Sequence, residues 1–406
     1  KPVALTHWPD LPPETGGICL FTSRLRQLLP LPPTLTMHSA MAVLPRPNQA
    51  FWTLSAIWSG WLWGREAVKP LSSALERRRY DWQWHTTALH SAFSTLHRHV
   101  PEGFALHGWL PELVPGFLAA AMVAAEAAGF ELNQAALAPE PEFAQVRWVA
   151  SAAGKASASS RSPQRVIAEA VSAHLAERNE PSLYLPIYTA GMAALAENHL
   201  LPSHQGQLSY DTLSRIQGMV STAFIDQTQF RRFDSRLKNI ESGWWWLTQP
   251  PASAEPPLAD RVEMEVVKAL IRRGPIHPVE LMGELAEIFP GLLTPSMELI
   301  RECLESYAEM DQSSPPRWQL KATEQPATRR NDLRAVQVGL LRLGKRLGLR
   351  AEGEFPVRWQ AASGEAVLFL YPVVSGVISR ALLMPEGAPE RCVLVLPGSR
   401  SRLITY

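Results

Sequence analysis

The chain has 406 residues, 46% hydrophobic and 19% charged; this balance excludes an intrinsically disordered protein and leaves room for roughly two to four domains. Its three cysteines, Cys19, Cys303 and Cys392, lie far apart, which argues against a disulfide framework or a cysteine zinc site and favours the cytoplasm. The apolar run at 51–64 is too short to span a membrane, so no membrane partner is expected. Because the chain starts with Lys1 and stops after an apolar stretch, we expect a segment of a longer polypeptide.

Residues 1–150 are predicted to form an α/β domain. Residues 1–45 are rich in proline and form a lead-in with one short helix near 23–29. Periodicity then predicts alternating elements: helices at 51–63 and 80–96, a strand at 105–109, a helix at 116–128 and a strand at 130–137. Such alternation is typical of helices layered on a sheet.

A small, polar stretch at 150–163 predicts a flexible linker, and a helical domain follows at 163–249. Its predicted helices are 164–177, 189–199 and 210–225, and Trp244–Trp246 closes it. A second linker at 250–257 precedes a winged-helix-like domain at 257–322. There, helices at 258–272, 278–288 and 295–310 come before a strand at 317–320, and Thr294 is the expected N-cap of the third helix.

Charge is distributed unevenly between this domain and the last one. Between 258 and 311 eleven acidic residues face five basic ones, whereas 317–402 holds fourteen basic and seven acidic residues. The third helix of the winged-helix-like domain carries Glu298, Glu302, Glu305 and Glu309 against Arg301, so it should repel DNA. We therefore expect this domain to contact protein partners.

The last domain, 328–406, is predicted to be small, basic and α+β. A helix at 331–349 leads into strands near 356–360, 366–374 and 392–396. On the helix Leu333, Val336, Leu340, Leu341 and Leu347 form an apolar stripe. Its basic residues occupy about a third of a turn on another face, which indicates binding to a phosphate backbone. The predicted nucleic-acid-binding residues are Arg334, Arg342, Lys345, Arg346, Arg350, Arg400 and Arg402.

Residues 35–64, LTMHSAMAVLPRPNQAFWTLSAIWSGWLWG, place an apolar strand before a proline-rich turn and a helix. This segment resembles the region around the catalytic motif of amino-methyltransferases, which methylate adenine N6 or cytosine N4 in DNA. Four further segments resemble the second half of that fold: YDWQWHTTALHSAFSTL (80–96), PEGFALHGWL (101–110), GFLAAAMVAAEAAGFEL (116–132) and QVRWV (145–149). The resemblance implies a partial Rossmann-like domain over residues 35–150, of a kind found in large prokaryotic DNA-methylase-like proteins.

The catalytic motif of that family, Asp/Asn/Ser-Pro-Pro-Tyr/Phe/Trp, is degenerate in this chain. The matching turn reads Leu44-Pro45-Arg46-Pro47, so the side chain that would accept a hydrogen bond from the target amine is aliphatic, and Asn48 substitutes only if the turn shifts register. The Phe-x-Gly-x-Gly loop that approaches S-adenosylmethionine is also missing. The resemblance therefore implies no confident catalytic or cofactor residues, and S-adenosylmethionine remains only a possible cofactor.

The tail at 356–406 resembles restriction-endonuclease-like domains, but it lacks their Asp…Glu-x-Lys metal pattern, so a non-cleaving module without metal is expected. These features favour a DNA-associated, methyltransferase-like protein that is inactive as this chain and binds both DNA and protein partners. Two alternatives stay open: an active DNA amino-methyltransferase that uses S-adenosylmethionine, and an assembly subunit of a prokaryotic defence complex without direct DNA contact.

Overall fold

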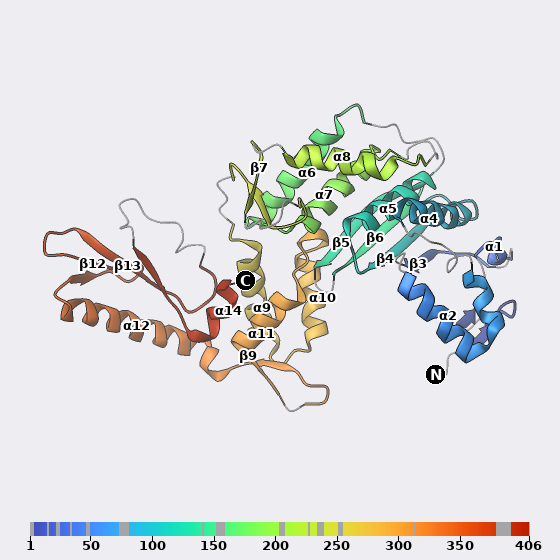
Figure 1. Cartoon of the computed structure of the whole chain (residues 1–406). Helices are drawn as coiled ribbons and strands as arrows, with labels where there is room; N and C mark the ends of the chain where they lie inside the picture. The colour runs from blue at the N-terminus through green and yellow to red at the C-terminus, as the bar shows by residue number, and fades with distance from the viewer. Residues whose placement is uncertain are drawn as a thin grey trace. The chain divides into compact units, whose positions relative to one another are not determined.

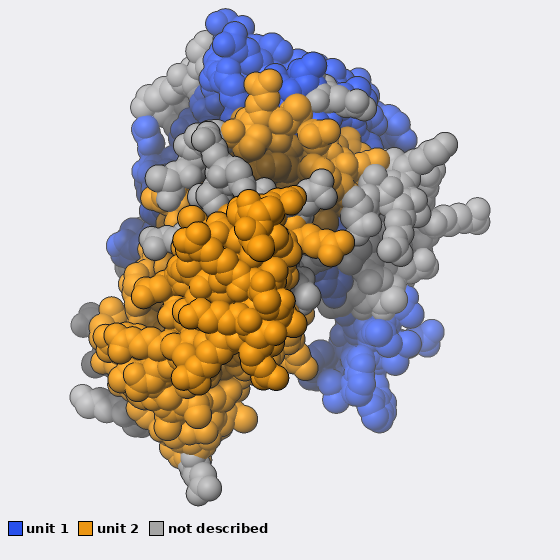
Figure 2. Space-filling model, turned by 90° about the vertical axis from the view of Figure 1, so that its left-hand side faces the viewer, with its two compact units in different colours: residues 1–135, 143–171, 187–230 blue, residues 136–142, 172–186, 231–406 orange. Residues whose placement is uncertain are grey.

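A computed structural model (Figure 1) describes residues 4–13, 16–21, 25–32, 35–45, 49–72, 81–139, 142–151, 159–202, 208–225, 228–233, 239–250, 255–311, 313–378 and 391–405. The chain is a mixed α/β protein with several small sheets, none of them closed, as the alternating pattern predicts. It divides into two compact units (Figure 2). Unit 1 comprises residues 1–135, 143–171 and 187–230, and unit 2 comprises residues 136–142, 172–186 and 231–406.

The proline-rich lead-in contains more regular structure than its composition predicts. Strands β1 (Ala4–His7) and β2 (Gly17–Leu20) pair in parallel, and the short helix α1 (Leu25–Leu28) follows. Pro9, Pro12 and Pro13 lie between the two strands and Pro30 and Pro32 lie after them, where no ladder N–H is needed. Only α1 matches a sequence expectation.

A four-stranded sheet of order β3-β4-β6-β5 is the centre of unit 1. Strand β3 (Ser39–Val43) runs parallel to β4 (Ala105–Pro111), which is antiparallel to β6 (Glu142–Ala150), and β5 (Phe130–Pro139) forms the far edge. Helices α4 (Trp82–His97) and α5 (Pro115–Ala127) carry the buried side chains of this layer. Between them and the sheet lie Leu106, Leu110, Phe117, Phe130 and Trp148, each at most 1% exposed.

The tryptophan-rich helix α2 (Gln49–Trp63) leads into the 3-10 turn η1 (Arg65–Leu71). Large aromatic side chains are usually buried, yet three tryptophans of this helix are exposed. Trp58, Trp61 and Trp63 are 54%, 76% and 72% exposed, whereas Ala56 is buried.

The middle of the chain is less purely helical than predicted. Helices α6 (Pro163–Arg178), α7 (Tyr184–Glu197) and α8 (Thr212–Ile225) match the expected pattern, but β7 (Phe230–Phe233) and β8 (Trp244–Leu247) pair with each other. About half of each expected linker, 150–163 and 250–257, falls outside the described residues.

Residues 258–320 form three helices and a small hairpin, in the predicted order. Helices α9 (Leu258–Arg273), α10 (Pro278–Ile288) and α11 (Met297–Tyr307), with the turn η2 (Gly291–Leu293), enclose one apolar core. Strand β9 (Ala308–Met310) pairs antiparallel with β10 (Trp318–Leu320), and Ile276 bridges to Trp318 from between α9 and α10.

The N-cap of α11 is Ser296 and not Thr294. The Ser296 side chain accepts a hydrogen bond from the backbone N–H of Leu299. Thr294 instead donates from its hydroxyl to the carbonyl of Gly291 at 2.9 Å, inside the preceding turn. Pro295 separates the two residues, which explains why the helix begins later than the sequence pattern indicates.

The C-terminal part of unit 2 places one long helix along a sheet (Figure 1). After η3 (Ala322–Glu324), helix α12 (Pro326–Arg346) precedes a sheet of order β11-β12-β13-β14. These strands are β11 (Arg350–Glu352), β12 (Val357–Gln360), β13 (Ala366–Pro372) and β14 (Cys392–Val395); the turn η4 (Gly398–Arg400) and helix α14 (Ser401–Thr405) follow.

Candidate nucleic-acid interface

Helix α12 is fixed to its sheet by one face. Leu340 and Leu341 pack on a cluster formed by Val357, Trp359 and Leu370 of β12 and β13. Gly344 is the buried residue of the helix, and a Cβ there would lie 2.7 Å from Nε1 of Trp359. Successive helical residues are separated by 100° around the helix axis. The face that packs on the sheet therefore also determines which residues of α12 point away from the protein.

The opposite face of α12 carries the predicted basic residues. Arg334, Arg342, Lys345 and Arg346 are all exposed. None of these four makes an ion pair with another residue that the structure describes. Residues 333–349 also contain no aspartate or glutamate, so nothing on this stretch of helix offsets the four positive charges. We call these four residues the α12 basic face.

Part of the apolar stripe is exposed beside the α12 basic face. Leu333, Leu340 and Leu341 are partly buried as expected, but Val336 and Leu347 are 40% and 60% exposed. Val336 lies outside the arc that the sheet covers, and Leu347 is the C-cap, beyond the last helical residue. The sheet therefore buries a narrower face than the sequence pattern indicates.

Two of the other predicted arginines already have carboxylate partners. Arg350 contacts Glu352, with 3.0 Å between Nη2 and Oε2. Arg402 bridges two acidic residues of α11, Glu305 at 3.1 Å and Glu302 at 3.6 Å. Both arginine side chains remain largely exposed, so these pairs reduce the local charge without removing the guanidinium groups from solvent.

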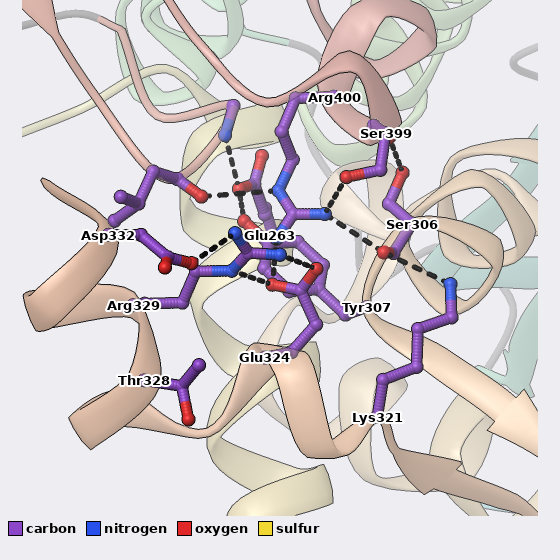
Figure 3. Close-up of polar contacts among 12 residues, drawn as sticks. Glu263, Ser306, Tyr307, Lys321, Glu324, Thr328, Arg329, Asp332, Ser399 and Arg400 are labelled. Carbon is purple, nitrogen blue, oxygen red and sulfur yellow. Dashed lines mark hydrogen bonds and ion pairs between the residues drawn. The ribbon is translucent and has the colours of Figure 1, made fainter. Parts of the chain in front are cut away.

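Arg400 is not on the surface, which corrects its prediction as a nucleic-acid-binding residue. Its side chain is 0% exposed and pairs with Glu324 (Figure 3). It also donates to the carbonyl oxygens of Ser306 and Val374, at 2.9 and 3.3 Å, and its Cζ lies 3.5 Å from the centre of the Tyr307 ring. A side chain enclosed by these groups cannot reach a phosphate.

Arg400 belongs to a buried polar network that joins three segments of unit 2 (Figure 3). Glu324, just before α12, accepts from Arg400 and, at 2.5 and 2.8 Å, from Arg329 of α12. On the other side, Glu263 of α9 accepts from the Tyr307 hydroxyl and, at 2.6 Å, from the backbone N–H of Gly376. The network thus attaches the base of α12 and the C-terminal turn to the three-helix core.

Burial dominates the protonation equilibria in this network. Loss of solvent raises the pKa of Glu263, although the hydrogen bonds from Tyr307 and Gly376 and the charge of Arg400 act in the opposite direction. The pKa values of the Tyr307 hydroxyl and the Cys303 thiol are also raised, mainly by burial. The Tyr307 hydroxyl and the Cys303 thiol therefore stay protonated near neutral pH, and the arrangement is suited to holding segments together.

The degenerate motif begins inside the sheet layer of unit 1. Leu44 follows β3, is 3% exposed and donates its backbone N–H to the carbonyl of Trp109 at 2.8 Å. Pro45 is exposed, whereas Arg46, Pro47 and Asn48 lie outside the described residues. Leu44 is thus a buried aliphatic side chain that contributes to packing.

Sequence reasoning missed the acidic partners of the network, Glu263 and Glu324. One signal was present for Glu324: it precedes a helix rich in arginine, five residues before Arg329. No comparable signal linked Glu324 to Arg400 or Glu263 to its partners, because these contacts join positions 44 or more residues apart.

No family model, curated protein sequence or solved structure matches this chain in comparisons with known proteins. Within the described residues no group of three or more His, Cys, Asp or Glu side chains is arranged to hold a metal ion. The described helices also include none with the length and apolar character needed to cross a membrane.

Proposed function

We propose that this protein binds the sugar-phosphate backbone of DNA through the α12 basic face. The observation that carries the proposal is the position of Arg334, Arg342, Lys345 and Arg346 on the side of α12 that points away from its sheet, without acidic partners among the residues that the structure describes. When unpaired, solvated cations on a rigid helix bind a nucleic acid, they displace its counterions, and the release of these counterions drives association. Because phosphates are alike, such contacts position DNA without reading its sequence.

The spacing of these residues fits a backbone that runs along the helix. At 1.5 Å per residue, the twelve steps from Arg334 to Arg346 span about 18 Å. A DNA strand advances about 3.4 Å per base pair, so this length faces about five phosphates. The sheet under α12 keeps the face extended, because Gly344, Leu340 and Leu341 are fixed against β12 and β13.

The first test is a gel-shift titration of the triple variant Arg342→Ala, Lys345→Ala and Arg346→Ala. We expect its affinity for a DNA duplex at about 50 mM salt to fall by at least tenfold, because each lost phosphate contact removes counterion release. The matched control is Arg165→Ala on α6, an exposed arginine that already pairs with Glu169 at 2.8 Å. Equal affinities for wild type and triple variant would refute the proposal.

We further propose that unit 1 is a methyltransferase-like scaffold that is inactive as this chain. A parallel strand pair followed by an antiparallel hairpin, with helices packed on it, supports the resemblance in fold. The buried Leu44 supports inactivity, because it offers no side-chain acceptor for a target amine. Calorimetry with S-adenosylmethionine tests this second proposal: no heat of binding is expected, and saturable binding would favour the active enzyme.

A protein-contact role for the three-helix module, which we propose to be winged-helix-like, rests on a separate observation. A groove of about 290 Å³ lies between α9 and α10, with Leu281 and Leu285 among its lining residues. Ile271 and Ile288 lie at the groove and are 51% and 49% exposed. An apolar groove with a charged rim suits the apolar face of a partner helix. Ile271→Glu should abolish such binding while leaving DNA affinity unchanged.

A further inference from the structure

Strand β3 leaves one of its two hydrogen-bonding edges open. Leu44, which continues β3, donates its N–H to the carbonyl of Trp109 in β4. Successive residues of a strand direct their backbone groups to alternate sides, so Ala40 and Ala42 also face β4. The N–H and C=O groups of Met41 and Val43 therefore point to the opposite edge, where they have no partner among the described residues.

This edge has none of the features that prevent strand pairing. The sequence of β3, SAMAV, contains no charge, proline or glycine, and Met41 and Val43 are 82% and 69% exposed. Proteins usually protect an edge with charged residues, proline or a bulge. The other edge of the same sheet, β5, includes Glu131, exposed Asn133 and Gln134, and a terminal Pro139. The sheet is thus protected at one edge and open at the other.

We propose that β3 pairs with β3 of a second copy of this chain. Two edge strands related by a two-fold axis meet antiparallel, so every open N–H finds a C=O of its partner. Around a two-fold axis each charged residue lies near the same residue of the other copy, so charged surfaces repel each other there. Strand β3 contains no Asp, Glu, Lys or Arg, so two copies of it meet without this repulsion. The partner strand extends the four-stranded sheet into a continuous eight-stranded one.

The test uses the whole chain and a substitution that removes only the open-edge donor. Met41→Pro deletes an N–H that makes no bond within the chain, and proline is tolerated on a strand edge that faces solvent. We expect light scattering after size exclusion to report a dimer for wild type and a monomer for Met41→Pro, with the dimer dissociation constant raised at least about tenfold. Thermal unfolding checks that the variant keeps its fold.

Two further variants keep the proposal falsifiable. Val43→Lys brings like charges together beside the axis and should also give a monomer, even if Met41→Pro destabilises unit 1. Gln134→Lys, on the protected edge of β5, is the matched control and should remain dimeric. A wild-type chain that is monomeric up to about 100 µM, or a dimer unaffected by Met41→Pro and Val43→Lys, would overturn the proposal.

Discussion

Arg400 and Arg402 lie two residues apart in the same turn, yet their substitution by methionine should have very different effects. Arg400 is fully buried between Glu324, Tyr307 and two carbonyl oxygens, whereas the Arg402 side chain is 71% exposed. Removing one partner of a buried ion pair typically costs about 3–5 kcal/mol, because the remaining charge and its acceptors stay desolvated. An exposed pair contributes only about 0–1 kcal/mol.

The structure places Arg400→Met toward the lower end of that range. Glu324 keeps two hydrogen bonds from Arg329 after Arg400 is lost, so its carboxylate is not left alone. The Ser306 carbonyl keeps a hydrogen bond from Lys321 at 3.3 Å, so only the Val374 carbonyl loses its donor, at a cost of roughly 1–3 kcal/mol. We therefore expect Arg400→Met to cost about 3 kcal/mol and Arg402→Met less than about 1 kcal/mol.

Urea denaturation followed by circular dichroism measures both free energies of unfolding. The relevant transition is that of unit 2, and a double-mutant cycle with Glu324→Gln isolates the coupling between the two side chains. We expect a coupling energy of at least about 1 kcal/mol. Equal costs for the Arg400 and Arg402 variants, or zero coupling to Glu324, would refute the buried network.

Three further predictions concern single positions. Gly344→Ala should destabilise the packing of α12 because its Cβ would meet Trp359, whereas Gly339→Ala, with open space around it, should stabilise the helix by up to about 1 kcal/mol. Burial lowers the pKa of His85 from 6.5 to about 4 in the folded state. As the pH falls from 6.5, His85 is therefore protonated in the unfolded state before it is protonated in the folded state. Unit 1 should thus lose roughly 3 kcal/mol between pH 6.5 and 4, and His85→Phe should remove most of that loss in acid titrations followed by fluorescence. Ser296→Ala should cost about 1 kcal/mol in thermal unfolding through loss of the α11 cap; no change would exclude the cap.

Elements with a strong local pattern were predictable from the sequence. Helix α12 and its exposed basic face follow from a periodicity of 3.6 residues, because the apolar positions must meet the sheet and the arginines then point away. The three-helix module follows from Gly274-Pro275 and Phe289-Pro290-Gly291, which interrupt its helices at the expected places.

Contacts between distant segments were not predictable in the same way. Arg400 and Arg402 each follow a serine in the sequence, but Arg400 is buried by Glu324, Tyr307 and two carbonyl groups that lie 26 or more residues away. Strands β1 and β8 are only four residues long, so each depends on a partner strand that no local pattern identifies. The exposure of the tryptophans of α2 was not predictable for a related reason. Hydrophobicity predicts that a side chain is buried, but it does not identify the surface that would bury it.

The slope of log affinity against log salt tests the DNA-binding proposal most directly. For a duplex, this slope is about −0.9 for each phosphate contact, so the four residues of the α12 basic face predict a value near −3.6. Replacing Arg342, Lys345 and Arg346 by alanine should leave a slope near −0.9. A wild-type slope that the triple variant reproduces would show that other residues contact the phosphates and would contradict the proposed interface.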